Sequence, residues 1–317
     1  MASPTKLARL SLPNGFHLAD YRIVRKIGGG GFSFVYLAYD DKDKEVAIKE
    51  YLPGNLVTRD DAQRITPLSE ENSNMFKYGM RFFCEEGRSL ARISHPNIVK
   101  VENFFRANDT MYLVMQYEEG KTLQDHIRAH RGQIKESFIR RVFASLLNGL
   151  REVHAQKLLH LDIKPGNIYI RKDGSPVLID FGAVRQSFKK EHQKIMNLYT
   201  PGFAAPEQYH YGKDTLGPWT DIYGVGASIY ACLAGTPPIA ADVRVERDTL
   251  VPAITTWQGK YSHKLLAIVD ACLQIDPLSR PPSVFTLQKA LLDIQNMAID
   301  TPTLFESIRN TLYKDIF

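Results

Sequence analysis

Three side chains that could perform a group-transfer reaction lie close together between His160 and Asn167. Asp162 supplies a carboxylate, Lys164 supplies a cation two residues later, and Asn167 supplies an amide after three more residues. A carboxylate can orient an attacking hydroxyl, a lysine can offset the charge of a phosphoryl group, and an amide oxygen can bind Mg²⁺. Transfer of a phosphoryl group to a hydroxyl needs all three functions. The spacing therefore predicts phosphoryl-transfer chemistry.

A second carboxylate follows thirteen residues after Asn167. Asp180, Phe181 and Gly182 come directly after the apolar run Val177–Ile179, which is typical of a short strand. An Asp-Phe-Gly triplet alone is a common turn. Here it supplies a further oxygen ligand where a metal site formed with Asn167 requires one.

Four consecutive glycines, at positions 28–31, lie between two predicted strands. Glycines allow backbone amides to approach phosphate oxygens closely, and strands on both sides argue against a dinucleotide-binding helix. The pattern G-x-G-x-x-G-x-V is matched by Gly28, Gly30 and Val35, with Ser33 in place of the third glycine. A glycine-rich turn without a ligand remains the alternative.

Lys49 ends the apolar run that begins at Val46. A lysine in this position can bind the phosphates of a nucleotide when a carboxylate from the next helix holds it, and Glu85 and Glu86 lie on that predicted helix. The alternative is a strand that ends in a solvated lysine, with both glutamates on the surface.

The elements that must position these groups change character along the chain. The first third consists of short β-branched and aromatic runs separated by turn residues, which predicts strands. The predicted strands are Tyr21–Ile27, Phe34–Tyr39, Glu45–Tyr51, Ile98–Phe105 and Met111–Tyr117, and the one helix among them is Met80–Ile93. Beyond Gly120, apolar residues recur every three to four positions, which predicts helices at Phe138–Val153, Leu265–Cys272 and Val284–Ile294. A strand-rich small lobe therefore precedes a helix-rich large lobe, with the junction near Gln116–Gly120.

Length and composition limit the classes of protein that fit. A chain of 317 residues is long enough for about two domains. Its net charge of +5 does not resemble the dense basic surface of a nucleic-acid-binding protein, and its three widely spaced cysteines exclude a disulfide framework and fit a reducing compartment. The first twenty residues lack the apolar core of a secretory signal. The charge-free stretch Ile222–Ala241 is interrupted by glycines and prolines, so we expect a buried helix, no membrane segment and a cytoplasmic location.

In this order, from about Tyr21 to Ile294, the motifs resemble a protein kinase catalytic domain. Three fragments resemble bacterial, eukaryotic-like Ser/Thr protein kinases in particular: Ala47–Pro53, Pro201–Tyr209 and Gly217–Asp221. The resemblance implies a bilobal α+β fold, with a small antiparallel sheet and one helix in the first lobe and mainly helices in the second. The implied divisions are an extension at 1–20, the small lobe at 21–117, the large lobe at 118–298 and a tail at 299–317.

The resemblance also implies a role for each motif residue. Lys49 would bind phosphates and pair with Glu86 rather than Glu85, because Glu86 lies ten residues before Pro96, the usual spacing in the family.

Asp162 would orient the substrate hydroxyl and Lys164 would lie beside the γ-phosphate, while Asn167 and Asp180 would hold Mg²⁺, with Mn²⁺ as the alternative ion. Met115 matches the gatekeeper position. The residues expected to bind ATP are Gly28, Gly30, Ser33, Val35, Ala47, Lys49, Met115, Gln116, Glu118 and Tyr169.

Among these residues, Val35, Ala47 and Tyr169 would lie against the adenine ring. Backbone groups of Gln116 and Glu118 would meet its edge.

Four further residues are expected to shape the substrate-binding and catalytic loops. Thr200, seven residues before Glu207, would bond to the catalytic aspartate and lysine. Glu207 would pair with Arg280 beneath the substrate loop, and Asp221 would cap the backbone of the catalytic loop.

Leu161 stands where many regulated kinases have an arginine that pairs with a phosphorylated activation loop, and leucine cannot form that pair. We therefore expect activity that does not depend on activation-loop phosphorylation through this route, with modification of Ser187, Tyr199 or Thr200 left open. Gly166 occupies a position that is often acidic in kinases that choose basic substrates, so a strong preference for arginine before the acceptor is not expected.

The function that follows is transfer of the γ-phosphate of ATP to Ser/Thr hydroxyls of protein substrates, and of the chain itself, in bacterial signalling. A nucleotide-binding scaffold with little catalysis is the alternative, although such proteins usually lose one of the six chemical residues, and none is lost here. A kinase of a small-molecule hydroxyl is disfavoured by Thr200 and by Ala205-Pro206-Glu207, which resemble a peptide-holding segment.

Two regions have no motif to explain them. The polar stretch Pro53–Asn74 precedes the Glu86 helix, and we expect a passive surface insertion, with control of the helix position as the alternative. In the tail, Leu304, Ile308 and Leu312 form a helical apolar stripe, which we expect to pack on the same chain rather than on a partner.

Overall fold

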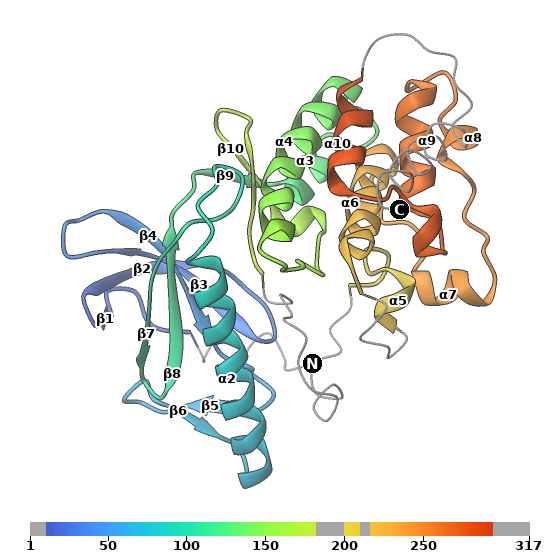
Figure 1. The fold of residues 1–317 in the computed structure, drawn as a ribbon. Helices are drawn as coiled ribbons and strands as arrows, with labels where there is room; N and C mark the ends of the chain where they lie inside the picture. The colour runs from blue at the N-terminus through green and yellow to red at the C-terminus, as the bar shows by residue number, and fades with distance from the viewer. Residues whose placement is uncertain (1–10, 182–199, 210–215, 294–317) are drawn as a thin grey trace. The chain divides into compact units, whose positions relative to one another are not determined.

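The computed structural model describes residues 11–181, 200–209 and 216–293 (Figure 1). The chain forms two compact units. Unit 1 contains the residues up to His95 together with Val99–Glu119, and unit 2 contains Pro96–Ile98 and the residues from Gly120 onward. Unit 1 is a β-sheet with one long helix and unit 2 is mainly helical, which is the expected α+β, bilobal fold class.

Unit 1 is built on a six-stranded antiparallel sheet with the order β1-β2-β3-β4-β8-β7. The strands are β1 (His17–Leu18), β2 (Tyr21–Gly29), β3 (Ser33–Tyr39), β4 (Glu45–Tyr51), β7 (Val101–Ala107) and β8 (Thr110–Gln116). Every residue of β4 after Glu45 is buried. Because successive side chains of a strand point to opposite faces, both faces of β4 are covered by other parts of the chain.

The long helix of unit 1, α2 (Glu70–Leu90), packs against β7 and β8. Ser69 is its N-cap, with an Oγ that accepts from the N–H of Asn72 at 3.2 Å. Its buried residues recur every three or four positions: Phe76, Gly79, Phe83, Glu86, Gly87 and Leu90. The helix begins ten residues before the predicted start at Met80, because its first turns are polar and show no apolar period.

The stretch Pro53–Asn74 is not confined to the surface of unit 1, so the expectation of a surface insertion is wrong, whereas its role in helix position is not tested by the fold alone. It contains β5 (Val57–Arg59) and β6 (Ile65–Pro67), which pair as an antiparallel hairpin, and it then enters the first turns of α2. The hairpin contributes to the core of unit 1 through Leu56, Val57 and Ile65. Its apolar runs are only one or two residues long and flank a polar turn, which is why the sequence pattern did not reveal the strands.

Part of the predicted N-terminal extension belongs to unit 1. Leu12 and Leu18 are buried, and β1 pairs with β2. The N–H of Leu12 donates to the Tyr36 hydroxyl at 3.1 Å. Residues 1–10 and the predicted apolar stripe of the tail lie outside the described residues.

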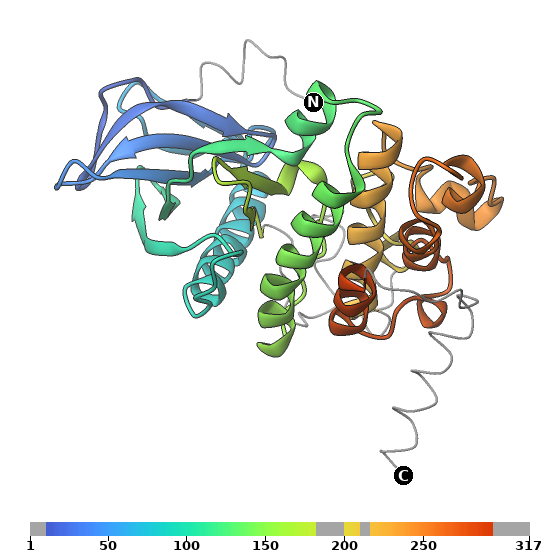
Figure 2. The ribbon, with the colours of Figure 1, turned by 90° about the horizontal axis from the view of Figure 1, so that it is seen from above.

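Unit 2 begins with a small antiparallel sheet of the order β11-β10-β9 and continues as helices. Its strands are β9 (Gly120–Thr122), β10 (Ile168–Arg171) and β11 (Pro176–Leu178). Its four main helices are α4 (Glu136–Ala155), α6 (Pro218–Ala234), α9 (His263–Cys272) and α10 (Val284–Leu292), and they pack against one another around the core (Figure 2). The shorter helices are α3 (Leu123–Ala129), η1 (Pro165–Asn167), α5 (Pro206–Tyr209), α7 (Ala241–Glu246), α8 (Ala253–Thr256) and η4 (Pro277–Ser279). The three helices predicted for this half of the chain are confirmed as α4, α9 and α10.

The charge-free stretch that begins at Ile222 forms most of α6, which ends at Gly235 in a left-handed conformation with φ +77°. Most residues of α6 are buried inside unit 2, which explains why the helix is apolar on all sides. Among the described residues, none of the helices combines the length and the apolar character that crossing a membrane requires.

We predict that Gly79→Ala destabilises unit 1. A Gly→Ala change inside a helix normally gains up to about 1 kcal/mol, but a Cβ at Gly79 would overlap the hydroxyl of Tyr51, and overpacking costs about 1–3 kcal/mol. The free energy of unfolding, measured with urea, should therefore fall by about 1–2 kcal/mol. Adding Tyr51→Phe should recover part of the loss, and Gly31→Ala, where a Cβ meets open space, is the control. A stabilised Gly79→Ala protein would contradict the proposed overlap.

Candidate active site

Four of the predicted ATP-binding residues lie on one face of the sheet of unit 1. Directly paired residues of antiparallel strands share a face, as do residues two apart on one strand. Val35 of β3 pairs with Lys49 of β4, and Ala47 of β4 pairs with Met115 of β8. The register therefore gathers these four side chains on the same face.

The glycine-rich turn joins β2 to β3. Gly28 pairs with Val35, and the N–H of Gly30 donates to the carbonyl of Ser33 at 2.9 Å, which closes the turn. Gly29 has a φ of +139°, and a Cβ there would lie 2.7 Å from the Ser33 carbonyl oxygen, so this position requires glycine. Added Cβ atoms at Gly30 would meet open space. The backbone at Gly30 therefore carries no side chain and has open space where one would begin, as a close approach by phosphate oxygens requires.

Lys49 and Glu86 form a buried ion pair, with Nζ and Oε1 3.2 Å apart. Glu86 is on the buried face of α2, whereas Glu85 is exposed. The predicted choice of Glu86 over Glu85 is therefore confirmed. Because neither charge can be left unpaired in the interior of unit 1, the pair fixes the position of α2 against β4.

In unit 2 the loop His160–Asn167, called the catalytic loop below, brings its three functional side chains together. The Nζ of Lys164 donates to Asp162 Oδ2 at 2.7 Å, and the Nδ2 of Asn167 donates to the same oxygen and to the Asp162 carbonyl, each at 2.9 Å. The side chains of Asp162 and Lys164 are 21% and 28% exposed. The carboxylate is therefore held in one orientation and remains accessible.

Thr200, which lies six residues before the start of α5, also belongs to this cluster. Its Oγ1 donates to Asp162 Oδ1 at 2.9 Å and accepts from the Nζ of Lys164 at 2.9 Å. Both contacts predicted for Thr200 are confirmed. Each carboxylate oxygen of Asp162 thus has at least one donor, and Lys164 bridges the aspartate and the threonine.

Asp221, on α6, holds the start of the catalytic loop. The backbone N–H groups of His160 and Leu161 donate to its two carboxylate oxygens at 2.9 and 2.7 Å, which confirms the predicted cap. Leu161 has a φ of +63°, a conformation that costs a non-glycine residue about 1–3 kcal/mol. The carboxylate of Asp221 therefore stabilises a strained backbone directly before Asp162.

The charge of Asp221 is itself stabilised. Burial alone would raise its pKa, but the hydrogen bond and charge of His154 and the N–H of His160 outweigh burial, so the pKa of Asp221 lies below its ordinary value. The Nε2 of His154 lies 2.7 Å from Asp221 Oδ2. Burial lowers the pKa of His160, more than the neighbouring carboxylates raise it.

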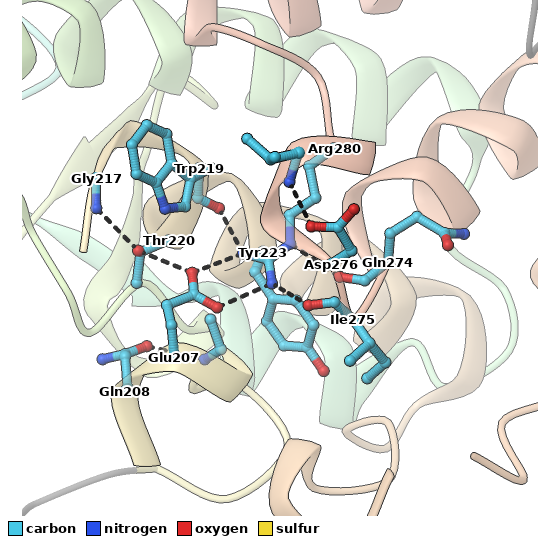
Figure 3. Close-up of polar contacts among 12 residues, drawn as sticks. Glu207, Gln208, Gly217, Trp219, Thr220, Tyr223, Gln274, Ile275, Asp276 and Arg280 are labelled. Atoms are coloured by element: carbon cyan, nitrogen blue, oxygen red, sulfur yellow. Dashed lines mark hydrogen bonds and ion pairs between the residues drawn. The ribbon is translucent and has the colours of Figure 1, made fainter. Parts of the chain in front are cut away.

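Glu207 and Arg280 form the predicted buried ion pair in unit 2 (Figure 3). Two guanidinium nitrogens of Arg280 donate to the two carboxylate oxygens at 2.7 and 2.9 Å, and the hydroxyl of Thr220 donates to Glu207 Oε1 at 2.9 Å. Arg280 also donates to the carbonyls of Gln274, Ile275 and Trp219. This arginine therefore ties α5, which follows Thr200, to α6 and to the loop before η4.

The residues predicted to hold a divalent cation fit a hard ion such as Mg²⁺. The Nδ2 of Asn167 is engaged with Asp162, so its Oδ1 is the side-chain atom suited to bind a cation. The N–H of Ile179 donates to the Asn167 carbonyl at 2.9 Å, which brings the residue before Asp180 beside Asn167. An amide oxygen and a carboxylate are ligands that Mg²⁺ prefers when phosphate oxygens and water complete its coordination. Among the described residues there is no cluster of three His, Cys, Asp or Glu side chains that would favour a different metal.

The remaining predicted ATP contacts concern Gln116, Glu118 and Tyr169. Gln116 ends β8, and its N–H donates to the Lys100 carbonyl at 2.9 Å. Glu118 follows in unit 1, and Tyr169 lies in β10 of unit 2, opposite Thr122. Their contacts with the adenine stay predictions.

Two residues that shape the catalytic loop were missed by sequence reasoning. His154 binds Asp221, and Gln208 donates to the Leu161 carbonyl at 2.9 Å while its Oε1 accepts from the N–H of Ala205 at 2.9 Å. His154 lies one helical turn after Leu150 on the buried face of α4. A titratable side chain on an apolar face was the available signal for His154, whereas nothing in the sequence distinguished Gln208.

Comparison with known proteins shows a family to which this fold and these motifs are similar. The model of the "Protein kinase domain" family matches residues 21–292. The serine/threonine-protein kinase PrkC of Bacillus subtilis is 28% identical over 297 residues, which cover 91% of this chain and 41% of PrkC. The serine/threonine-protein kinase PknA of a Nostoc species is 27% identical over 291 residues, which cover 88% of this chain and 47% of PknA.

A solved structure, described as the apo form of PpkA-294, is similar with a TM-score of 0.80 and 36% sequence identity over 89% of this chain and 99% of that chain. The chain spans less than half the length of the two curated relatives.

We predict that Asp221→Asn removes an acid-sensitive part of the stability. Folding favours the ionised carboxylate, so its contribution is fully present above the unfolded pKa near 4 and is lost as the pH falls toward the lower native pKa. Urea unfolding should show a loss of about 3 kcal/mol at pH 7 and a smaller loss at pH 3.5. Asp242→Asn, at an exposed position, should show little effect at either pH. Equal losses for Asp221→Asn at both pH values would contradict this assignment.

Proposed function

Because this chain belongs to the protein kinase domain family, and its named bacterial relatives are serine/threonine-protein kinases, we propose that it transfers the γ-phosphate of ATP to serine and threonine hydroxyls of proteins. The observation that supports this most directly is the cluster of Asp162, Lys164, Asn167 and Thr200 in unit 2. It combines an accessible carboxylate with a cation and an amide, which are the groups that phosphoryl transfer to a hydroxyl requires.

In this mechanism Asp162 accepts a hydrogen bond from the acceptor hydroxyl and takes up its proton. The bond from the acceptor oxygen to the γ-phosphorus forms as the bond from that phosphorus to the bridging oxygen breaks, and ADP leaves with the bridging oxygen. Asn167 and Lys164 donate to Oδ2 of Asp162, so its orientation is set before a substrate arrives. Lys164, which bridges Asp162 and Thr200, offsets negative charge on the phosphoryl group. The protein thus acts by positioning and by charge stabilisation rather than by covalent chemistry.

Unit 1 supplies the residues that we propose for ATP binding. Lys49, held by Glu86, binds phosphate oxygens, and the backbone of the glycine-rich turn approaches them closely. Val35, Ala47 and Met115 form the apolar part of the same sheet face and suit the adenine ring.

The further contacts belong to the proposal as well: backbone groups of Gln116 and Glu118 at the adenine edge, and Tyr169 against the ring. Asn167 and Asp180 would hold Mg²⁺, with Mn²⁺ as an alternative, and a bound divalent ion would neutralise charge on the triphosphate. Thr200 and the Glu207–Arg280 pair support a loop for a peptide substrate, which favours a protein over a small molecule as the acceptor.

We also place the domain in the cytoplasm, where ATP is supplied. Its cysteines Cys84, Cys232 and Cys272 are all free thiols, which suits a reducing compartment. Serines and threonines of the chain itself are proposed as substrates beside those of other proteins.

We predict that Asp162→Asn lowers turnover about 10²- to 10⁴-fold while ATP binding is retained, because the change removes the proton acceptor and leaves unit 1 unaltered. The measurement is γ-phosphate transfer from ATP with Mg²⁺ to a mixed peptide library and to the chain itself, with phosphosites mapped by mass spectrometry. ATP affinity is measured in parallel by calorimetry.

Lys49→Met is the matched variant in unit 1 and should lower both ATP affinity and turnover. Phosphoserine and phosphothreonine that form only with the unaltered protein would support the proposal. ATP binding without transfer by the unaltered protein would instead indicate a nucleotide-binding scaffold, and Asp162→Asn with full turnover would remove the role of Asp162.

We predict that turnover does not depend on phosphorylation of the segment after Asp180. Leu161 is buried and cannot pair with a phosphate, while its N–H is held by Asp221 and its carbonyl by Gln208. Protein treated with a phosphatase should therefore keep its turnover in an assay with a fixed peptide. Ser187 and Tyr199 lie outside the described residues, and their modification is read from the phosphosite map. Loss of turnover in Ser187→Ala that Ser187→Glu restores would contradict this prediction.

A further inference from the structure

Glu50, the residue after the phosphate-binding Lys49, is a fully buried carboxylate that the proposed mechanism does not use. Strand alternation directs it to the face of the sheet opposite that of Lys49. Three donors surround it: Arg59 Nη2 at 2.7 Å and the Tyr112 hydroxyl at 2.6 Å on Oε1, and the Tyr36 hydroxyl at 2.8 Å on Oε2. A buried carboxylate with a donor on each oxygen is a built interaction rather than a surface charge.

The cationic partner of Glu50 comes from the β5–β6 hairpin. Arg59, the last residue of β5, has a side chain that is only 2% exposed, and its Nη1 donates to the carbonyl of Gln63 at 2.9 Å. This single side chain therefore joins the turn of the hairpin to β4. Arg59 is thus the side chain through which the hairpin forms an ion pair with the sheet of unit 1.

The two tyrosines act as donors to Glu50 and anchor further segments. Burial, and then the charge of Glu50, raises the pKa of Tyr36 and of Tyr112 far above the usual range, so both hydroxyls keep their protons. Tyr36 also accepts from the N–H of Leu12, and Tyr112 also accepts from the Nδ2 of Asn108. The network thus connects β3, β4 and β8 with the N-terminal segment and with the turn between β7 and β8.

The hairpin leads directly into α2, the helix that carries Glu86. Only Leu68 and Ser69 separate the end of β6 from the helix, and Ser69 is the N-cap. The N–H of Leu68 donates to the Leu56 carbonyl at 2.9 Å, and the N–H of Ile65 donates to the Asn108 carbonyl at 2.9 Å. Contacts that fix the position of the hairpin therefore also fix the position of the first turn of α2.

Three consecutive residues of β4 consequently determine where α2 lies. Lys49 pairs with Glu86 of α2. The ring of Tyr51 stacks on that of Phe76, with centroids 5.4 Å apart, and its centroid lies 5.7 Å from that of Phe83, which is also on α2. Between Lys49 and Tyr51, Glu50 binds the hairpin that precedes the helix. Strand alternation sends the first and third of these residues to the helix and the second to the opposite face.

We propose that Arg59 is a positioning residue for phosphoryl transfer: its buried ion pair with Glu50 holds the β5–β6 hairpin, and through it the start of α2, so that Glu86 stays paired with Lys49. This role rests on the kinase activity proposed above and adds to it a residue outside the family motifs. A buried ion pair contributes little net stability once desolvation is included, but its strict geometry fixes the segments that it joins. The chain thereby holds its own Lys49–Glu86 pair, without a modification or a partner that pushes on the helix.

The test compares two arginines of the same hairpin. Arg59→Met removes the ion pair, whereas Arg64→Met removes an equal charge from an exposed position. Peptide phosphorylation is measured at a temperature where circular dichroism shows all variants folded. Arg59→Met should raise the KM for ATP and lower kcat/KM about 10- to 100-fold, Arg59→Lys should recover part of the loss, and Arg64→Met should match the unaltered protein.

A double-mutant cycle with Glu86→Gln separates positioning from a general loss of structure. If Arg59 acts through the Lys49–Glu86 pair, then Arg59→Met in the Glu86→Gln background should change ATP affinity and kcat/KM by no more than about twofold. Effects that multiply in the double variant would overturn the proposal. So would an Arg59→Met protein with a lower melting temperature and an unchanged kcat/KM.

Arg59→Met leaves an unpaired buried carboxylate and could fail to fold. The variant that combines Glu50→Gln with Arg59→Met removes both charges and is then used in its place. It should show the same kinetic loss, and full kcat/KM in this variant would overturn the proposal.

The two proposals fail in different ways. No transfer by the unaltered protein would contradict the kinase activity, and the cycle would then be read from ATP affinity alone. Transfer by the unaltered protein with equal activity of Arg59→Met and Arg64→Met would contradict the role of Arg59 alone.

Discussion

A carboxylate that is removed from water must be given hydrogen-bond donors, and Glu50, Asp221 and Glu207 show, beside Glu86, how this constraint organises the described residues. Glu50 gathers Arg59 and two tyrosines in unit 1. In unit 2, Asp221 accepts hydrogen bonds from the backbone of the catalytic loop, and Glu207 forms an ion pair with Arg280. Each of them joins segments that are distant in sequence. Asp162 and Lys164, which are proposed for the chemistry, stay partly exposed, and the buried carboxylate of Asp221 holds the backbone directly before Asp162.

Strand β4 shows how this constraint serves the proposed function. Its alternation gives one face to Lys49 and the other to Glu50, so neighbouring residues perform separate tasks. On one face, an ion pair fixes Lys49 against α2. On the other face, a second ion pair fixes the hairpin from which α2 starts. The helix is thereby held at its start and near its end by the same strand, and a displacement at either point would have to break a buried ion pair.

The sequence predicted well what depends on local spacing and poorly what depends on burial. The cluster around Asp162 follows from a single tight loop, and the choice of Glu86 over Glu85 follows from its distance to Pro96. The buried helix α6 follows from a charge-free stretch whose glycines and prolines argue against a membrane segment. By contrast, the start of α2 was missed because its first turns are polar, and the β5–β6 hairpin was missed because its apolar runs are short. The Glu50–Arg59 pair joins two charged residues of ordinary types, and only the fold shows that both are buried.

Both units hold their functional side chains with contacts that belong to the chain itself. The backbone of Leu161 is fixed by Asp221 on one side and Gln208 on the other, and the start of α2 is fixed by the Glu50–Arg59 pair. Breaking such buried contacts is costly, because it leaves a charge without a partner. The contacts of Asp162 with Lys164 are partly exposed, so water can replace them at a much lower cost. A ligand or a modification that controls this domain would therefore need the least free energy to act on the contacts around Asp162. The buried ion pairs would stay intact and keep the surrounding backbone in place.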